Sequence, residues 1–463
     1  MENIEISKIL TQGEQFEGKS ILVAGWVRTA RDSKNMAFIA LNDGSSLTHL
    51  QLVIDKNTYT GELAKFLKVG VSLEATGIVV KALNNNGYEL NVTGLELLGD
   101  CPQDYPLQKK YHTMEFLRTI PHFRVRTNTF NAMLRVRSKL AFAIHQFFQE
   151  NDYTYVHTPI ITGSDCEGAG EIFHVTTRDY NSAKECKSEE EYIAGDFFKR
   201  TAGLTVSGQL EGEVAALALG KIYTFGPTFR AEMSYTPRHA AEFWQIEPEV
   251  AFAKLPDIIK IAEAMIKFIT KKILEQCGPE LDFFEKNFEQ GLKAKLQNVV
   301  DSEFKVLDYS DAIEILKKVP EGTFEFPVEW GLDLQSEHER YITEKVFQKP
   351  VFVTNYPKDI KAFYMKQNPD GKTVAATDLL VPGIGEIIGC SEREADYDKL
   401  LEAIQKRGMK ESDYKFYLDL RKYGSVPHSG FGLGFERMLM YVTGIQNIRD
   451  VQLYARTTGD LMM

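Results

Sequence analysis

The sequence predicts an α+β protein built from a small N-terminal β-barrel and a larger domain in which helices flank an antiparallel sheet. Short strand patterns separated by turn signals fill residues 18–100, whereas amphipathic helices alternate with strands after residue 129. These later strands do not follow the repeating pattern of a parallel sheet with crossover helices. At 463 residues the chain is also too long for a single core.

Five strand candidates define the barrel. The turn sequences at 42–44 and 84–87 separate neighbouring strands, and a brief helix is expected at 61–67, after the third strand. Five strands with a helix after the third are typical of an OB-fold. We therefore expect an OB-fold domain over residues 1–102, with strands at 21–27, 37–41, 49–54, 71–80 and 88–93.

The strand pattern stops at Cys101–Pro106, which predicts a linker or hinge over residues 103–128. The larger domain is then expected to occupy residues 129–463. Its first element is an amphipathic helix over 129–150, followed by a strand that ends at Pro159. Further predicted elements are a mobile, charged insertion near 178–196, a helix that begins at Pro256, and strands at 351–356, 362–365 and 373–381.

Composition excludes several classes of protein. No window is apolar enough to span a bilayer, and the acidic start lacks the pattern of a signal peptide. The five cysteines form no CxxC pair, so a reducing cytoplasm is the simplest compartment. The net charge of −11 argues against nucleic-acid binding over the whole surface. A restricted basic track remains at residues 109–139, with a solvated helix face and a basic linker as the alternative.

Two distant segments carry the chemistry. In the first, an apolar run delivers Arg230, a polar loop carries a second cationic pair at Arg238 and His239, and a strand returns over 242–247. The second is a Gly-rich turn that enters a helix, Gly430–Arg437. Guanidinium groups grip phosphate oxygens and a flat ring stacks on adenine, so the pattern suits a nucleoside triphosphate. A surface network of salt bridges is the alternative for either segment alone.

The two segments resemble motifs 2 and 3 of class II aminoacyl-tRNA synthetases. The helix over 129–150 and the strand ending at Pro159 resemble motif 1, which builds a homodimer interface in that family. A barrel ahead of the catalytic domain resembles subclass b, whose members use aspartate, asparagine or lysine. Longer matches most resemble the asparagine enzymes; they lie at 164–171, 206–210, 383–389 and 423–432.

The resemblance implies that L-asparagine is joined to the α-phosphate of ATP and then transferred to tRNA(Asn). Arg230 and Arg437 are the expected catalytic residues, at the α-phosphate and at the far end of a bent ATP. Phe243 is expected to stack on adenine; a core ring is the alternative. By resemblance the ATP-binding set is Arg230, Glu232, Arg238, His239, Phe243, Glu386 and Arg437.

Two carboxylates, Asp378 and Glu386, match the positions that bind Mg²⁺ in this subclass. Hard carboxylate oxygens suit Mg²⁺, and phosphates would complete its coordination. The alternative is that one of the two only balances a nearby arginine.

The resemblance also implies an amino-acid pocket. Glu167 matches the contact to the α-ammonium group, and Ser207 and Gln209 line the same pocket. Arg393 is expected to hold the side-chain oxygen of the substrate and Glu247 to accept from its NH₂ group. Aspartate enzymes place a lysine where this chain has Gly212, so the missing cation favours asparagine.

In the barrel, Phe38, Gln51 and Glu89 match positions that stack on and read anticodon bases. A buried strand residue is the alternative for Phe38. The chain departs from the asparagine pattern at Met233, Tyr235 and Cys390, and in the tail over 453–463.

Three rival functions remain open at this point. One is an aspartyl or dual-specificity synthetase, which Gly212 and Glu247 disfavour. Another is a paralogue that does not charge tRNA, such as an amide-forming synthetase, although those lack the barrel. The third is a non-enzymatic RNA-binding protein, which would need no phosphate-binding arginines.

Overall fold

The computed structural model describes residues 2–82, 87–166, 171–179 and 181–462. The chain forms two compact units, residues 1–132 and 133–463, and each is considered by itself. Within the described ranges, no helix is long and apolar enough to cross a membrane.

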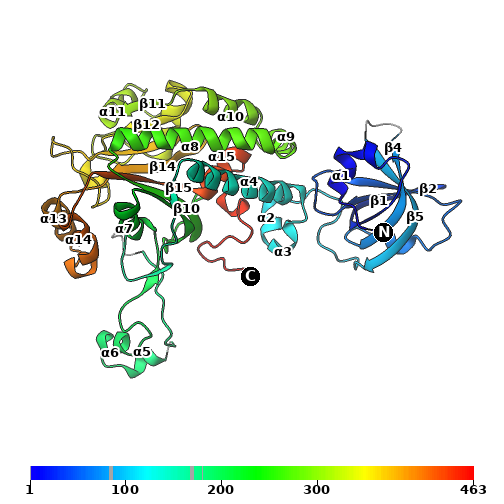
Figure 1. Cartoon of the computed structure of the whole chain (residues 1–463), viewed down its shortest axis with the longest axis horizontal. Helices are drawn as coiled ribbons and strands as arrows, with labels where there is room; N and C mark the ends of the chain where they lie inside the picture. Colours follow the sequence, from blue (N-terminus) through cyan, green and yellow to red (C-terminus); the bar gives the residue numbers. More distant parts are fainter. Residues whose placement is uncertain (1, 83–86, 167–170, 180, 463) are drawn as a thin grey trace. The chain divides into compact units, whose positions relative to one another are not determined.

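The first unit contains a closed five-stranded barrel in the order β1-β2-β3-β5-β4, which confirms the predicted OB-fold (Figure 1). Alternate side chains of each strand point into its core. The predicted helix at 61–67 is wrong: only the 3₁₀ turn η2 (Ala64–Phe66) forms there, and the Phe66 side chain is buried in the barrel core. A single bond from the Phe66 amide to the Leu63 carbonyl, 2.9 Å long, closes this 3₁₀ turn, and burial of Phe66 needs no further helical turn. The strands are β1 (Ser20–Asp32), β2 (Met36–Asn42), β3 (Leu50–Asp55), β4 (Ser72–Lys81) and β5 (Tyr88–Gly99), and helix α1 (Ile6–Thr11) precedes them.

Two short helices lie in the segment predicted as a linker. Helix α2 (Met114–Arg118) begins at Thr113, whose side chain accepts a hydrogen bond from the Phe116 amide. Helix α3 (Pro121–Arg124) begins with a proline, as helices commonly do. The guanidinium group of Arg126 then lies 5.4–5.8 Å from three rings of this unit, those of Trp26, Tyr105 and Phe123.

The second unit is built on an eight-stranded sheet in the order β11-β12-β13-β14-β15-β10-β9-β6. The six strands from β12 to β9 are antiparallel, as predicted, and only the edge pairs β11–β12 and β6–β9 are parallel. The strands are β6 (Thr154–Tyr155), β9 (Lys221–Phe229), β10 (Glu242–Ala251), β11 (Lys305–Asp308), β12 (Val351–Thr354), β13 (Ala376–Val381), β14 (Gly385–Glu392) and β15 (His428–Gly434).

Helices cover the sheet, and three of them position the site. Helix α8 (Leu255–Gln276) packs across β13, β14 and β15, whereas α7 (Gln209–Leu219) packs against β9 and β10. Helix α15 (Phe435–Thr443) follows β15 directly and contacts β10. The others are α4 (Asn128–Glu150), α9 (Gly278–Asn287), α10 (Leu292–Asp301), α11 (Tyr309–Lys317), α12 (Ser336–Arg340), α13 (Tyr397–Lys406) and α14 (Lys415–Lys422).

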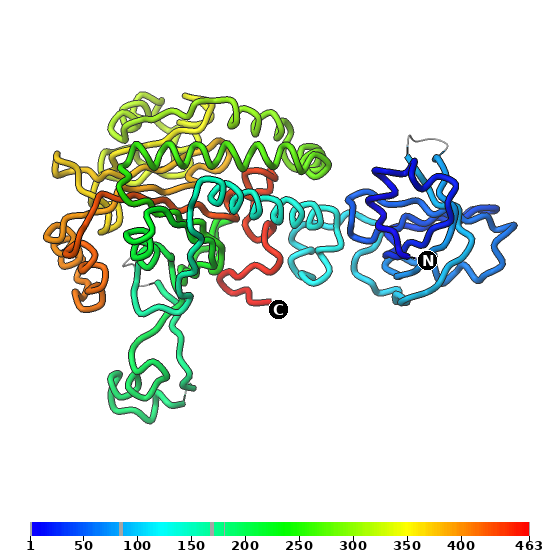
Figure 2. Tube along the Cα trace, viewed as in Figure 1, coloured from blue at the N-terminus to red at the C-terminus, as the bar shows by residue number. Residues whose placement is uncertain are grey.

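The segment predicted as an insertion extends away from the sheet of this unit (Figure 2). It carries two short helices, α5 (Ser182–Glu185) and α6 (Glu189–Ala194). The two-stranded ribbon of β7 (Ile161–Thr162) and β8 (Gly203–Leu204) lies at its base. The chain leaves β8 for the start of α7, so the insertion joins the sheet beside the predicted amino-acid pocket.

Three local predictions are corrected by the structure. Residues 362–365 form no regular strand: Phe363 and Tyr364 pack among the side chains of α13 and α14, and Met365 makes an isolated bridge to Arg393, just beyond β14. The strand expected to end at Pro159 shortens to the two residues of β6. The Gly-rich turn before Arg437 is in fact strand β15.

Strand β15 needs a glycine at position 430. A Cβ atom there would lie 2.1 Å from the Glu249 carboxylate, which fills the space against the backbone. A glycine inside a strand often marks such a close approach. The sequence pattern that resembled a turn is therefore the mark of a side chain from β10 packed against β15.

Candidate active site

The seven residues predicted to bind a nucleotide line one cavity of about 150 Å³. Strand β10 and the loop that connects β9 to it form one wall. Strands β14 and β15 and the first turn of α15 form the other. Two sequence segments about two hundred residues apart are thus brought together by the pairing of β10 with β15.

Arg230 and Phe243 face each other across the β9–β10 hairpin. Arg230 follows the last residue of β9, and its amide donates to the Ala241 carbonyl over 3.0 Å. Its guanidinium group lies 5.4 Å from the centroid of the Phe243 ring. The hairpin therefore presents a phosphate-binding fork beside a flat ring, which is the pairing that ATP needs.

Arg238 and His239 lie farther along the loop between β9 and β10. Arg238 donates to the Ser336 hydroxyl over 2.7 Å, which ties the loop to α12. Partial burial and the neighbouring Arg437 lower the pKa of His239, whose Nδ1 contacts the hydroxyls of Ser234 and Thr236. Within the expected cationic pair, Arg238 is thus a permanent cation, and the lowered pKa of His239 favours its neutral form.

Arg437 enters the cavity from the first turn of α15. Its guanidinium group donates to the carboxylate of Glu386 over 3.1 Å and to the Glu386 carbonyl over 3.2 Å. This contact holds the arginine in place before any phosphate arrives. The position of Arg437 in a helix that begins directly after β15 agrees with the sequence prediction.

The predicted metal ligands approach each other over Gly389. A Cβ atom on this glycine would lie 3.4 Å from Glu386 Oε1 and 3.6 Å from Asp378 Oδ1, so these two oxygens converge on one space. Within the described residues, no group of three or more His, Cys, Asp or Glu side chains is arranged as a metal site. Two hard oxygens that face one space fit a Mg²⁺ ion that takes its remaining ligands from phosphate and water.

Ser207, Gln209 and Glu247 meet at the start of α7. Glu247 accepts from the Ser207 hydroxyl, from the Gly208 amide over 2.9 Å and from the Thr224 hydroxyl over 3.2 Å. Both carboxylate oxygens are therefore engaged within the protein. The predicted contact residue Glu167 lies outside the described residues.

Arg393 is held by a glutamate that the sequence analysis missed. Its Nε atom donates to Glu249 over 3.2 Å and Nη2 makes a second bond to the same carboxylate. Nη1 donates to the Ser391 hydroxyl over 2.6 Å. Glu249 follows Glu247 by two positions in β10, so strand alternation places both on one face. That alternation is the pattern that would have identified it.

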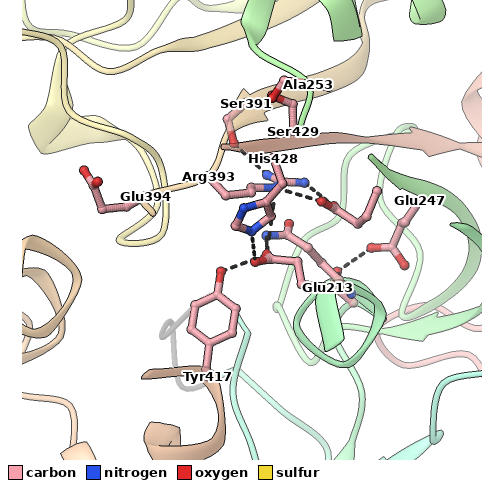
Figure 3. A network of polar contacts seen from close by, with 12 residues as sticks. Glu213, Glu247, Ala253, Ser391, Arg393, Glu394, Tyr417, His428 and Ser429 are labelled. Carbon is pink, nitrogen blue, oxygen red and sulfur yellow. Dashed lines mark hydrogen bonds and ion pairs between the residues drawn. The ribbon is translucent and has the colours of Figure 1, made fainter. Parts of the chain in front are cut away.

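A second missed residue, Glu213 of α7, is the centre of a buried network (Figure 3). Its carboxylate accepts from Arg421 over 2.7 Å, from the Tyr417 hydroxyl over 2.8 Å and from the Gln209 amide over 3.0 Å. His428 lies 2.8 Å away. Burial alone would raise the pKa of Glu213, but Arg421 and His428 hold it well below its usual range.

The network fixes the orientation of Gln209. Because its NH₂ group donates to Glu213, its carbonyl oxygen is left to accept from a substrate donor. Arg393 also lies 3.9 Å from Glu213. Gln209 and Arg393, two of the residues expected to contact the amino acid, are thus both held by buried glutamates.

Gly212 leaves space beside Glu247. A Cβ atom there would meet only Ile222 at 3.5 Å and Thr224 at 3.8 Å, both ordinary contacts. Thr224 in turn donates to Glu247. A β-carbon can therefore be added at position 212 without a clash.

The departures from the family pattern lie at different depths. Met233 and Tyr235 are exposed on the β9–β10 loop. Cys390 is buried in β14, and burial raises the pKa of its thiol well above the usual range. None of the three lines the nucleotide cavity.

The three predicted anticodon residues lie together on the barrel. Gln51 of β3 pairs with Glu89 of β5 and donates to its carboxylate over 3.2 Å. Phe38 of β2 and Gln51 line a cavity of about 350 Å³ together with Arg31 and Lys109. An aromatic ring, hydrogen-bonding groups and cations around a cavity suit an unstacked base.

Comparison with known proteins agrees with this geometry. Residues 113–458 match the family of class II tRNA synthetases (D, K and N). The chain belongs to that family. Residues 21–98 match the OB-fold nucleic acid binding domain.

Relatives over the full length are named as asparagine enzymes. Asparagine–tRNA ligases of Clostridium tetani and Phocaeicola vulgatus are 54% and 53% identical, over 99% of both chains in each case. The structure of asparaginyl-tRNA synthetase from Pyrococcus horikoshii with asparaginyl-adenylate is 33% identical and has a TM-score of 0.87. It covers 100% of this chain, which covers 99% of it. The Entamoeba histolytica enzyme with the same adenylate is 28% identical, with a TM-score of 0.83 and coverage of 99% and 98%.

Replacing Arg437 tests the nucleotide cavity. Arg437→Ala should lower the rate of amino-acid-dependent ATP–pyrophosphate exchange by about 10²–10³-fold, since one preorganised phosphate contact is lost. Arg437→Lys keeps the charge but loses the planar fork, so its rate should lie between the two. Near-normal exchange in a folded Ala variant would remove Arg437 from the mechanism.

Proposed function

We propose that this synthetase activates L-asparagine with ATP and transfers it to tRNA(Asn). The proposal is supported by one observation: two predicted sites are built on the same strand. The seven-residue nucleotide cavity and the pocket of Gln209, Glu247 and Arg393 share strand β10. The names of the relatives identical at 51–54% support the same activity.

In the first step, a carboxylate oxygen of asparagine attacks the α-phosphorus of ATP and pyrophosphate leaves. Arg230 stabilises charge at the α-phosphate. Arg437 releases its hydrogen bond to Glu386, donates to a phosphate oxygen instead and so positions the far phosphates. Asp378 and Glu386 would hold Mg²⁺, which neutralises phosphate charge when bound. Phe243 stacks on the adenine ring.

Charge balance selects the amino acid. Arg393 is already neutralised by Glu249, so it offers hydrogen bonds without a free positive charge. A carboxamide adds no charge to this pocket. The carboxylate of aspartate would add an uncompensated negative charge near Glu249, Glu213 and Glu247. Shape alone cannot separate the two amino acids, so this electrostatic mismatch has to.

In the second step, a ribose hydroxyl of the terminal adenosine attacks the carbonyl carbon of the adenylate, and AMP leaves. The barrel reads the anticodon in this proposal: Phe38 stacks on a base, and Gln51 and Glu89 bond to base edges. The fixed pairing of Gln51 with Glu89 supports this assignment, because it presents one defined pattern of donors and acceptors.

A homodimer is proposed through α4 and the strand region ending at Pro159. A cavity of about 250 Å³ there is lined by Tyr155, His157, Ile160 and Trp244. Ile160, Ile161 and Trp244 are 37–46% exposed, which suits an interface. A monomer by light scattering at micromolar concentration, with full activity, would contradict it.

The five free thiols fit the expected cytoplasmic location.

An aspartyl or dual-specificity enzyme is the nearest alternative. It would need a cation for the substrate carboxylate, and Arg393 is already paired within the protein. Gly212 supplies none. A paralogue that does not charge tRNA is disfavoured by the anticodon-type barrel.

Amino-acid specificity is tested by adding a cation at position 212. Gly212→Lys should cut asparagine-dependent exchange and raise aspartate-dependent exchange, because the new ammonium group partners Glu247 or a substrate carboxylate. Glu247→Gln should narrow the preference for asparagine, which we expect to be on the order of 10⁴ in the wild type. Val214→Lys, at an exposed position on the same helix, is the matched control and should change neither rate. Unchanged selectivity in the Gly212 and Glu247 variants would refute the role of this side of the pocket.

The barrel is tested by separating charging from activation. Phe38→Ala should weaken tRNA(Asn) charging by about 1–3 kcal/mol of lost stacking and leave pyrophosphate exchange unchanged. Gln51→Ala should behave alike. If exchange falls in parallel with charging, these side chains are structural and the anticodon assignment fails.

A further inference from the structure

Each carboxylate proposed to hold Mg²⁺ already has a cation of the protein on its second oxygen. The ammonium group of Lys361 lies 2.5 Å from Asp378 Oδ2. The guanidinium group of Arg437 lies 3.1 Å from Glu386 Oε2. The other oxygens, Oδ1 and Oε1, are those that converge over Gly389. Each carboxylate thus directs one oxygen toward the shared space over Gly389, while a cation of the protein neutralises its other oxygen.

Lys361 is held firmly in this position. Its ammonium group lies 3.9 Å from the centroid of the buried Tyr356 ring, and its side chain is only 15% exposed. Its carbonyl accepts a hydrogen bond from Arg407. The contact with Asp378 therefore holds the positive charge of this lysine beside the proposed metal site.

The charges of the two proposed ligands are balanced in the metal-free protein. Asp378 faces the ammonium group of Lys361, and Glu386 faces the guanidinium group of Arg437. A divalent ion that entered alone would bring an excess of positive charge beside Lys361 at low dielectric, which is unfavourable.

ATP reverses this balance. Its phosphates supply several negative charges and draw Arg437 away from Glu386, as the proposed mechanism requires. Lys361 cannot move away from its carboxylate in the same way, because it is enclosed by Tyr356 and Asp378. The cost of bringing Mg²⁺ next to Lys361 is therefore offset only when the triphosphate is present.

We propose that Lys361 is a positioning residue that holds Asp378 in the metal-free protein and makes metal binding conditional on the nucleotide. This inference rests on the proposed function, because it needs Asp378 and Glu386 to be the metal ligands. An ion pair that only stabilises the fold would not affect the order in which metal and nucleotide bind. By linkage, the coupling between the two ligands is the quantity to measure.

The experiment is equilibrium dialysis of the full-length protein against Mn²⁺, which takes the same oxygen ligands as Mg²⁺. It is run with and without an ATP analogue that carries a methylene group between the β- and γ-phosphorus atoms. The wild type should bind Mn²⁺ at least about tenfold more tightly with the analogue, within the usual range of coupling. Equal affinity in both conditions would overturn the inference and leave the metal site itself intact.

Variants of Lys361 give a gain of binding that damage to the fold cannot imitate. Lys361→Met should bind Mn²⁺ without the analogue at least about tenfold more tightly than the wild type, so the coupling shrinks. Lys361→Arg keeps the charge and should behave like the wild type. Lys358→Met, three residues earlier, is the matched control and should change nothing. Unchanged nucleotide-free affinity in a folded Met variant would contradict the proposal.

A last variant separates failure of this inference from failure of the metal site. Asp378→Asn should abolish the Mn²⁺ binding that depends on the analogue. If the wild type and Asp378→Asn retain the same Mn²⁺ with the analogue, Asp378 is no ligand, and both the metal assignment and this inference fail. Asparagine-dependent pyrophosphate exchange still tests the enzymatic function independently of that result.

Discussion

Two fully buried carboxylates, Glu213 and Glu249, hold the centre of the larger domain together. Glu213 joins α7 to α14 and to the start of β15, and Glu249 joins β10 to Arg393 beyond the end of β14. Burying such charges is expensive unless every one is partnered, and loss of one partner typically costs about 3–5 kcal/mol. The requirement for partners therefore dictates much else, including Gly430, whose missing side chain makes room for Glu249.

The same principle appears in both halves of the site. Arg393 is paired with Glu249 and Arg437 with Glu386 before any substrate is present. We propose that the buried pair in the amino-acid pocket persists when substrate binds and favours a neutral side chain. The pair in the nucleotide cavity is more exposed, and we propose that it opens to phosphate. In this proposal, burial decides which arginine selects the amino acid and which one binds phosphate charge.

The sequence predicted the residues that carry local patterns. Arg230, Phe243 and Arg437 lie in segments whose order of strand, loop and helix can be predicted from the sequence. The barrel could be predicted from the turn sequences that separate its strands. Glu213 and Glu249 were missed because a glutamate in a helix or strand shows no sign of its partner: Arg421 lies 208 residues from Glu213. The apolar residues 362–365 were taken for a strand, since a short apolar run does not reveal whether it joins a sheet or packs under helices.

We propose that a charge-balanced pocket beside the nucleotide cavity accepts asparagine alone. The most direct test is ATP–pyrophosphate exchange by the wild-type protein with each of the twenty amino acids in turn. Rapid exchange is expected with asparagine and only background exchange with the other nineteen. Comparable exchange with aspartate and asparagine would contradict it.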